Sequence, residues 1–217
     1  MGRLGLVAGS ALRGAELPDG DWELLQRHGE TAAYVLPHRI DHVANMRALA
    51  DAGCDRVLSV GSVGGLRAEL SPGTMLVPDD FIALDAVPLS SLEGESAHRT
   101  IGFDPEWRRR VLDGLAEAGA EPLDGAVYWH ANGPRFETPA EVRLIAAHAD
   151  VVGMTIGSEC VAACELGLRY AAVCMIDNLA NGVGRGELSL ELVEAAREDS
   201  RARFLAILAA LLPRLLP

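Results

Sequence analysis

Short apolar runs alternate with helix-like segments along most of this chain, and this alternation limits the possible folds more than any other feature. The runs are apolar at consecutive positions, which is typical of strands that are covered on both faces. Glycines or polar turn residues follow them. We expect strands at Leu4–Ala8, Arg56–Val60, Ala126–His130, Val151–Met154 and Arg169–Ile176, the second of them broken by the glycines of GSVGGL and the last stopped by Asp177-Asn178.

The segments between these runs carry signals for the start and end of helices. Two of them begin with an N-cap residue followed by proline, at Asp104-Pro105 and at Thr138-Pro139. Glycine ends two others, because it readily adopts the positive φ found at helix C-termini. The expected helices are 43–53, 104–118, one that begins at Thr138, 158–166, and a final helix that Ser189 caps and that ends near Leu215.

Two pairs of short runs resemble hairpins. Trp22–Gln26 and Tyr34–Leu36 flank the turn Arg27-His28-Gly29, and Thr74–Pro78 and Phe81–Leu84 form the second pair. Hairpins are antiparallel, whereas strand–helix–strand crossovers are parallel, so a sheet that contains both is mixed. The sequence therefore predicts an α/β fold: a single domain over residues 1–217 with a central mixed β-sheet flanked by helices.

Charge and apolar patterning argue against several classes of protein. The formal net charge of the 217 residues is −12, so we expect no nucleic acid partner. No run of 18 apolar residues is present, so we expect no transmembrane span and no membrane partner. The opening residues MGRLGLVAGSAL lead directly into a strand-like run and lack the features of a signal peptide.

The four cysteines indicate reduced thiols. Cys54, Cys160, Cys164 and Cys174 all lie in apolar segments, where free cysteine packs as a small apolar side chain. Cys160 and Cys164 are one helical turn apart, but no CxxC motif or nearby histidine pair supports a metal site. We therefore expect a reducing, cytoplasmic location and no metal.

Polar and glycine-rich residues gather where the expected strands end, which is where α/β sheets bind ligands. Each has a plain structural interpretation by itself. Ser10 could be a turn residue, and Arg27 and His28 could be solvated charges. Glu137 could simply favour a helix start, and Asn178 could form an Asx turn. The polar and glycine-rich segments at the expected strand ends are Gly9-Ser10, Arg27-His28-Gly29, residues 61–65, residues 133–137, Met154-Thr155 and Asp177-Asn178.

Taken together, several strings resemble one family. GPRFETPAE, ADVVGMTIGSE and MIDNLANG are similar to the trimeric purine nucleoside phosphorylases, and most similar to the methylthioadenosine and methylthioinosine phosphorylases. LVAGSAL, RHG, PHRIDHVANMRAL and SVGSVGGLRAELSPGTMLVPDDFI follow the same pattern in the same order. The resemblance implies a pentosyltransferase that cleaves the N-glycosidic bond of a purine nucleoside with phosphate. It also implies a homotrimer, and no cofactor other than phosphate as co-substrate.

The resemblance further implies which residues hold the phosphate. They are Ser10, Arg27, His28, Ser62 and Thr155. Arg27 and His28 are expected to be catalytic as well, because they would hold the attacking anion against the sugar.

The resemblance also implies which residues bind the nucleoside. Phe136 would pack on the purine, Met154 would lie under the ribose, and Asn178 would be catalytic by bonding the base. A neutral amide suits a 6-oxopurine, but a register shift of one residue would place the acid Asp177 there instead. The remaining substrate-binding positions are Val63, Gly64, Glu137, Val152 and His98, the last either lent by a neighbouring subunit or simply an exposed loop residue.

Two alternatives remain open at this stage. Compared with the family, the chain is shortened between Ser10 and Arg27 and again within residues 90–103, so the 5′ group of the nucleoside is undetermined. A purine nucleosidase would use water in place of phosphate, and a binding protein would recognise the nucleoside without turnover. The retained phosphate positions argue against the first alternative, and the retained phosphate and base positions together argue against the second.

Overall fold

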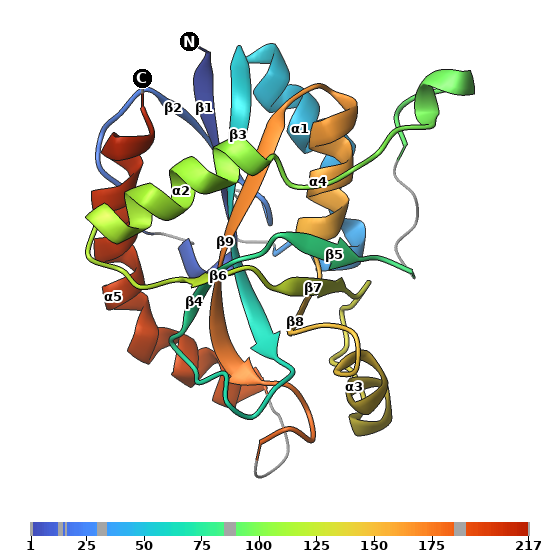
Figure 1. The fold of residues 1–217 in the computed structure, drawn as a ribbon, viewed down its shortest axis with the longest axis vertical. Helices are drawn as coiled ribbons and strands as arrows, with labels where there is room; N and C mark the ends of the chain where they lie inside the picture. Colours follow the sequence, from blue (N-terminus) through green and yellow to red (C-terminus); the bar gives the residue numbers. More distant parts are fainter. Residues whose placement is uncertain are drawn as a thin grey trace.

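The computed structural model describes residues 2–12, 15, 17–29, 34–84, 90–184 and 190–216, which form one mixed nine-stranded sheet with helices packed on it (Figure 1). The strands are β1 Arg3–Ala8, β2 Trp22–Gln26, β3 Cys54–Gly65, β4 Met75–Val77, β5 Asp80–Ile82, β6 Leu123–Asp124, β7 Val127–His130, β8 Val151–Gly153 and β9 Arg169–Leu179. The helices are α1 His42–Asp51, α2 Pro105–Glu117, α3 Pro139–Ile145, α4 Ile156–Glu165 and α5 Leu190–Leu215, with 3-10 turns at Ser10–Leu12, Pro37–Arg39 and Gly94–Ala97.

Strand β3 organises the sheet. Strand β9 lies parallel to it along one edge for most of its length. Two strands share the other edge: β1 runs parallel to it as far as Ser59, and β8 pairs antiparallel with Gly64 and Gly65. Between Ser59 and Gly64 this edge has no strand partner among the described residues, so the sheet is open there.

The helices form a layer on each face of the sheet. Helices α2 and α5 pack on one face, where Trp107 and Leu211 join the alternate residues Leu58 and Val60 of β3. Helices α1 and α4 cover the other face (Figure 1), where they meet residues such as Val57. Apolar residues therefore occupy both faces of the central strands, which explains their continuous apolar runs. The α/β class and the mixed, helix-flanked sheet are confirmed, whereas the single domain over 1–217 stays a prediction.

The first expected hairpin is wrong. Strand β2 pairs parallel with β1, and Tyr34–Leu36 is not a strand. Arg27-His28-Gly29 is instead a turn at the end of β2, in which the Gly29 amide donates to the Gln26 carbonyl. Residues 30–33 lie outside the described part of the chain. The apolar side chains of Tyr34 and Leu36 resemble those of a strand, but in the structure both line the cavity described below.

The second expected hairpin is wrong as well. Strands β4 and β5 do not pair with each other: β4 lies between β9 and β6, and β5 lies at the other end of the sheet beside β7. Only Pro78 and Asp79 separate the two strands, so the two ends of the sheet lie close together there. Strand β6 was not expected at all. Pairing between segments that are far apart in the chain leaves no local signature, so short strands are assigned to near neighbours too readily.

Two strands are longer than the sequence suggested. Strand β3 continues through the glycines of GSVGGL to Gly65, and β9 continues through Asp177 and Asn178 to Leu179. Glycine weakens a strand in isolation but is required where neighbours approach closely. A Cβ on Gly64 would lie only 3.2 Å from the Cγ1 of Val152 on β8. The expected helices are present within a few residues of their predicted ends, although Ser189 lies outside the described residues.

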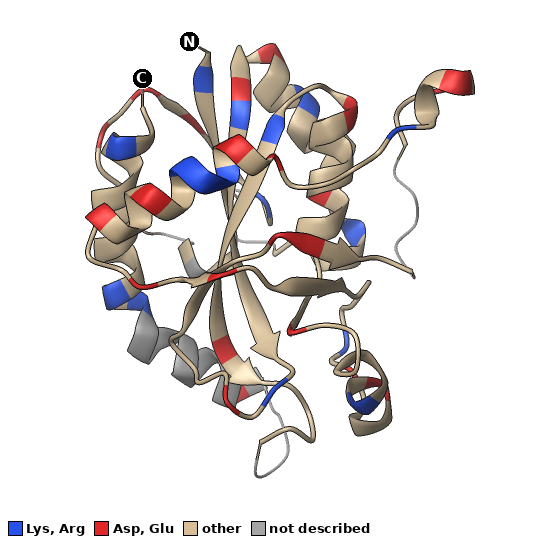
Figure 2. Cartoon of the chain, viewed as in Figure 1, with Lys and Arg blue, Asp and Glu red and all other residues tan. Residues whose placement is uncertain are grey.

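The charged residues lie interspersed over helices, strands and loops rather than gathered by sign (Figure 2). None of the helices in the described part of the chain is both long and apolar enough to span a membrane.

Candidate active site

A cavity of about 640 Å³ lies beside the open stretch of β3. Segments distant in the sequence line it: the residues after β1 and β2, the second half of β3, the ends of β8 and β9, and the loop before α3. All but one of the site residues expected from the sequence are among the lining residues. They are Ser10, Arg27, His28, Ser62, Val63, Gly64, Phe136, Glu137, Val152, Met154, Thr155, Asp177 and Asn178.

The sheet register orders these residues along β3. Strands β1 and β2 end side by side, and β1 leaves β3 at Ser59. Ser10 and Arg27 follow these two ends and therefore reach the part of β3 that contains Ser62. The residue expected to meet the base, Asn178, lies beside β3 two positions further along. The expected phosphate group and the expected base group thus occupy neighbouring levels of one cavity.

The guanidinium of Arg27 is buried and held on several sides. Its Nη1 donates to the carbonyl of Val60 at 3.0 Å, on the stretch of β3 whose edge opposite β9 has no strand partner among the described residues. Its Nη2 donates to Ser59 Oγ at 2.5 Å and to Glu159 Oε2 at 2.9 Å, and its Nε donates to Glu159 Oε1. The interpretation of Arg27 as a solvated turn charge is therefore wrong.

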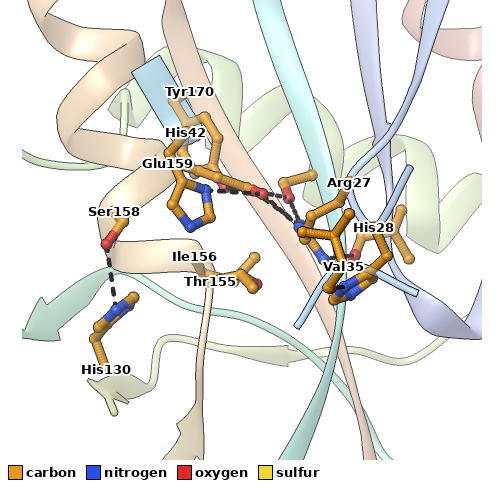
Figure 3. Close-up of polar contacts among 12 residues, drawn as sticks. Arg27, His28, Val35, His42, His130, Thr155, Ile156, Ser158, Glu159 and Tyr170 are labelled. Atoms are coloured by element: carbon orange, nitrogen blue, oxygen red, sulfur yellow. Dashed lines mark hydrogen bonds and ion pairs between the residues drawn. The ribbon is translucent and has the colours of Figure 1, made fainter. Parts of the chain in front are cut away.

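Arg27 and Glu159 form a buried ion pair (Figure 3). Burial alone would raise the pKa of the Glu159 carboxyl, but the charge and hydrogen bonds of Arg27 outweigh it and hold the pKa at about 2. Burial would likewise lower the pKa of Arg27, and the Glu159 carboxylate instead raises it above its ordinary value. Both groups are consequently charged across the physiological pH range.

The imidazole of His28 is oriented by its neighbours. Its Nδ1 lies 2.8 Å from the carbonyl of Val35, and since a carbonyl can only accept, Nδ1 carries a hydrogen. The ring stacks on Tyr34 with centroids 4.3 Å apart, and the Tyr34 hydroxyl lies 3.3 Å from Nε2. Both rings line the cavity, so Nε2 is the nitrogen of His28 that remains for a ligand, and it can donate to an anion when the imidazole is protonated.

Two hydroxyl groups in the cavity are available to a ligand. Thr155 is the N-cap of α4, yet its side chain makes no capping hydrogen bond. The amides of Thr155 and Ile156 already donate to the buried hydroxyl of Tyr128, at 3.2 and 3.4 Å. The Oγ of Ser62 is buried and has no hydrogen-bond partner among the described residues. Such a group normally has a partner, and a bound anion would provide one.

Asp177 and Asn178 both line the cavity because β9 has an irregularity there. Val63 pairs with Ile176 but Gly64 pairs with Asn178, so Asp177 is an extra residue on β9. Regular alternation would have sent one of the two side chains to the opposite face. The Nδ2 of Asn178 donates to the Leu179 carbonyl at 2.9 Å, which leaves its second N–H and its Oδ1 for a ligand.

The loop before α3 contributes an aromatic ring and a carboxyl group. Phe136 is 37% exposed although it lines the cavity, as expected for a ring that would cover a ligand. Burial raises the pKa of the neighbouring Glu137 carboxyl. A capping box between Thr138 and Glu141 fixes the start of α3, and thereby the end of this loop.

His98 is the expected site residue that does not line the cavity. It is exposed and follows the short turn Gly94–Ala97, which projects from the body of the molecule (Figure 1). The expectation that a neighbouring subunit lends it is not tested by a single chain.

Sequence reasoning missed the buried residues behind the cavity. The clearest is Glu159, which lies within the string ADVVGMTIGSE but has no expected role there. A carboxylate on an otherwise apolar helix was the available signal, because charged residues are almost never fully buried without a partner. Ser59, Tyr128 and Tyr170 gave no comparable signal. Within the described residues, no group of three or more His, Cys, Asp or Glu side chains could hold a metal ion.

Comparison with solved structures agrees with this architecture. The methylthioadenosine phosphorylase of Schistosoma mansoni in complex with adenine superimposes with a TM-score of 0.82, covering 96% of this chain and 90% of that one. The sequence identity is 21%, so this similarity shows the shared fold alone.

Sequence comparison is more specific. The "Probable 6-oxopurine nucleoside phosphorylase" of Archaeoglobus fulgidus is 41% identical over 184 residues, which is 83% of this chain and 74% of the relative. The "Probable S-methyl-5'-thioinosine phosphorylase" of Methanocaldococcus jannaschii is 36% identical over 180 residues, 81% and 71% of the two chains. The profile of the Phosphorylase superfamily matches residues 17–213. With this match over most of its length, the chain belongs to the Phosphorylase superfamily.

Proposed function

We propose that this chain cleaves the N-glycosidic bond of a 6-oxopurine nucleoside with inorganic phosphate, releasing the free base and ribose 1-phosphate. The observation that carries the proposal is that one cavity contains two groups of side chains. Hydroxyl, imidazole and guanidinium groups lie near Ser62 of β3, and an amide and a carboxyl group lie two positions further along this strand. Relatives named for 6-oxopurine nucleosides and for S-methyl-5'-thioinosine support the same chemistry.

The first group of residues suits a phosphate dianion. Ser10, Ser62 and Thr155 can each donate a hydroxyl hydrogen, Arg27 adds an N–H donor, and His28 adds Nε2–H when its imidazole is protonated. Phosphate held below the ribose would attack C1′ as the bond to the base breaks. The sugar passes through an oxocarbenium-like state whose positive charge the nearby anion stabilises. No cofactor is required for this step.

The second group suits a 6-oxopurine as leaving group. The amide of Asn178 can donate to the base at one atom and accept at another, so it can stabilise the departing purine. The carboxylate of Glu137 can accept the N1–H that a 6-oxopurine carries. A 6-aminopurine has a lone pair at N1 instead, which would face the Glu137 carboxylate unfavourably. Phe136 would pack on the purine ring, and Met154 would support the ribose.

The proposal covers inosine and its 5′-modified forms such as methylthioinosine. Val63, Gly64 and Val152 give the middle of the cavity an apolar wall against which a ribose or a thioether can pack. Residues 90–103 are the segment that would meet the 5′ group through His98. We propose that this segment belongs to the site of a neighbouring subunit in a homotrimer.

The proposed location and partners of the protein agree with this reaction. All four cysteines are free thiols, which fits a reducing cytoplasm. Purine nucleoside and phosphate are the partners that the cavity supports, and we propose no nucleic acid or membrane partner.

The deciding experiment measures base release from inosine, methylthioinosine, adenosine and methylthioadenosine, each with and without phosphate. We expect phosphate-dependent release of hypoxanthine from the first two. Release that does not need phosphate would identify a nucleosidase. Binding of inosine without release would identify a binding protein.

Base selection is tested by the variant Asn178→Asp. A carboxylate cannot donate to the purine as the amide can, so kcat/KM for inosine should fall by about 100-fold, and the inosine-to-adenosine ratio should shift toward adenosine. Asp177→Asn, at the adjacent position, is the matched control and should leave that ratio nearly unchanged. If the control variant shifts the ratio and Asn178→Asp does not, Asp177 selects the base.

A further inference from the structure

Glu159 is the most completely enclosed charge near the cavity. It lies on α4 and is 0% exposed. Besides Arg27, it accepts hydrogen bonds at Oε2 from Ser59 Oγ at 2.6 Å and from the Tyr170 hydroxyl at 2.7 Å. His42 Nδ1 lies 3.8 Å from its Oε1 (Figure 3). These groups come from four different elements, so Glu159 ties α4 to strands β3 and β9, to helix α1 and to the turn after β2.

These contacts leave Arg27 almost no freedom. A guanidinium has five N–H donors, and Glu159, Ser59 and the Val60 carbonyl together accept four hydrogen bonds from it. The remaining N–H is on Nη1 and has no acceptor among the described residues. Because Arg27 lines the cavity, that single N–H is the part of the guanidinium that remains for a ligand.

The pair also sets the charge that an anion meets. Arg27 is the one arginine among the lining residues, and the side chains of Glu137 and Asp177 add acidic groups to the same cavity. Opposite charges at hydrogen-bond distance largely cancel at longer range. A phosphate in this site is therefore bound mainly by directed hydrogen bonds, and the direction of the Arg27 donor matters more than its net charge.

We propose that Glu159 is a positioning residue for the phosphate site, which fixes the plane of the Arg27 guanidinium so that its one remaining N–H addresses the phosphate. The inference rests on the proposed phosphorolysis. Glu159 has no place among the lining residues, so it acts through Arg27 and not on the substrate. If Glu159 only stabilised the fold, its substitution would change the KM for phosphate and the KM for inosine equally.

The test compares the KM for phosphate with the KM for inosine in two variants. Glu159→Gln keeps the shape of the side chain but cannot accept the paired hydrogen bonds of Arg27. We expect its KM for phosphate to rise about tenfold or more, with the KM for inosine within about twofold. Tyr170→Phe removes one donor to Glu159 and leaves the ion pair, so its KM for phosphate should rise about threefold.

Asp55→Asn is the matched control. Asp55 pairs with Arg56 at 2.7 Å and Arg169 at 2.9 Å, at the opposite end of β3 from the cavity. We expect this variant to unfold at lower denaturant concentration while both KM values stay unchanged. Tyr170→Phe also keeps the test informative if Glu159→Gln fails to fold.

Two results would overturn the inference: a KM for phosphate that is unchanged in both variants, or KM values for phosphate and inosine that rise together. If the wild-type protein releases no base in response to phosphate, the proposed function fails instead. Calorimetric titration with inorganic phosphate then decides the role of Glu159. Weaker binding to Tyr170→Phe than to wild type would support it, and equal binding, or no binding to wild type, would refute it.

Discussion

His130 shows how a single buried residue links this fold to pH. It lies at the end of β7 with its Nε2 3.2 Å from Ser158 Oγ. Burial, with a smaller contribution from His42, lowers the pKa of His130 to about 4, and burial lowers the pKa of His42 as well. Both imidazoles are therefore neutral in the folded protein near pH 7.

This arrangement predicts a loss of stability in mild acid. In the unfolded chain His130 binds a proton near pH 6.5, whereas in the folded chain it does so only near pH 4. The unfolded state takes up more protons between these values, so stability falls as the pH drops through that window and is fully present above it. We expect the free energy of unfolding to decrease by about 2 kcal/mol from this residue between pH 7 and pH 5.

Urea unfolding of wild type and His130→Gln at both pH values checks this prediction. The variant cannot titrate, so its stability should depend less on pH, although His42 still contributes in the same direction. A pH dependence that is as steep in the variant as in the wild type would show that His130 is not the source. Glu159, whose pKa is about 2, adds its own loss only below about pH 4.5.

At the scale of single residues, sequence motifs predicted well which residues line the cavity, but they did not predict the buried residues that hold those side chains in place. Ser10, Arg27 and Asn178 lie in strings that resemble a family, so their positions could be assigned before the fold was known. The partners of Arg27 could not be assigned, because a contact between residues 132 positions apart leaves no trace in local spacing. The motif located the arginine, and only the structure shows that Glu159 holds it.

Secondary-structure elements were predicted by type more reliably than by partner. A helix cap such as Thr138 can be recognised from four consecutive residues of the sequence, and the capping box is present as expected. Strand pairing depends on residues far apart in the chain. Trp22–Gln26 was therefore assigned to a local hairpin, although its partner is β1 in parallel. Gly61 and Gly64 looked like strand breakers for the same reason, because their close neighbours belong to other elements.

The cap of α3 gives a prediction at this scale. The Thr138 side chain accepts from the Glu141 amide at 3.2 Å, and Phe136 and Glu137 immediately precede it. Thr138→Ala removes the cap and should reduce the free energy of unfolding by about 1 kcal/mol. Because the loop end is then less fixed, the KM for inosine should rise while the KM for phosphate stays the same.

Thr138→Ser is the control, since serine keeps the capping oxygen. It should behave as wild type in both the unfolding and the kinetic measurement. If Thr138→Ala lowers stability but leaves the KM for inosine unchanged, the loop before α3 is held by other contacts, such as the hydrogen bond of 3.3 Å from Asn181 Nδ2 to the Glu137 carbonyl.

At the scale of the whole molecule, the site arises because two strands share one edge of β3. Along that edge β1 pairs with β3 only as far as Ser59 and β8 pairs with it only from Gly64. The stretch of edge between them has no strand partner among the described residues, and there Arg27 donates to Val60 and the cavity opens. No sequence pattern indicates that two strands will share one edge of a third strand. The sequence could predict an α/β fold with ligands at strand ends, but not that one interrupted edge collects them all.

One segment projects from the surface of the chain. The turn Gly94–Ala97 stands out from the body of the molecule (Figure 1). Its neighbour Ser91 is anchored through its amide to Glu165 at 2.6 Å, which fixes the base of the projection. In the proposed homotrimer, a neighbouring subunit would cover this segment.

From the homotrimer that the family resemblance implies, we predict a mass of three times 23.0 kDa, about 69 kDa, in light scattering. If residues 90–103 complete the cavity of a neighbour, His98→Ala and Asn178→Ala damage different chains of the same site. Each variant alone should then be nearly inactive toward methylthioinosine, because every site lacks one group. Mixed trimers from co-expression contain some sites with both groups intact, so activity should partly recover. A mass of 23.0 kDa, or co-expressed variants no more active than either alone, would show that each chain builds its site without help.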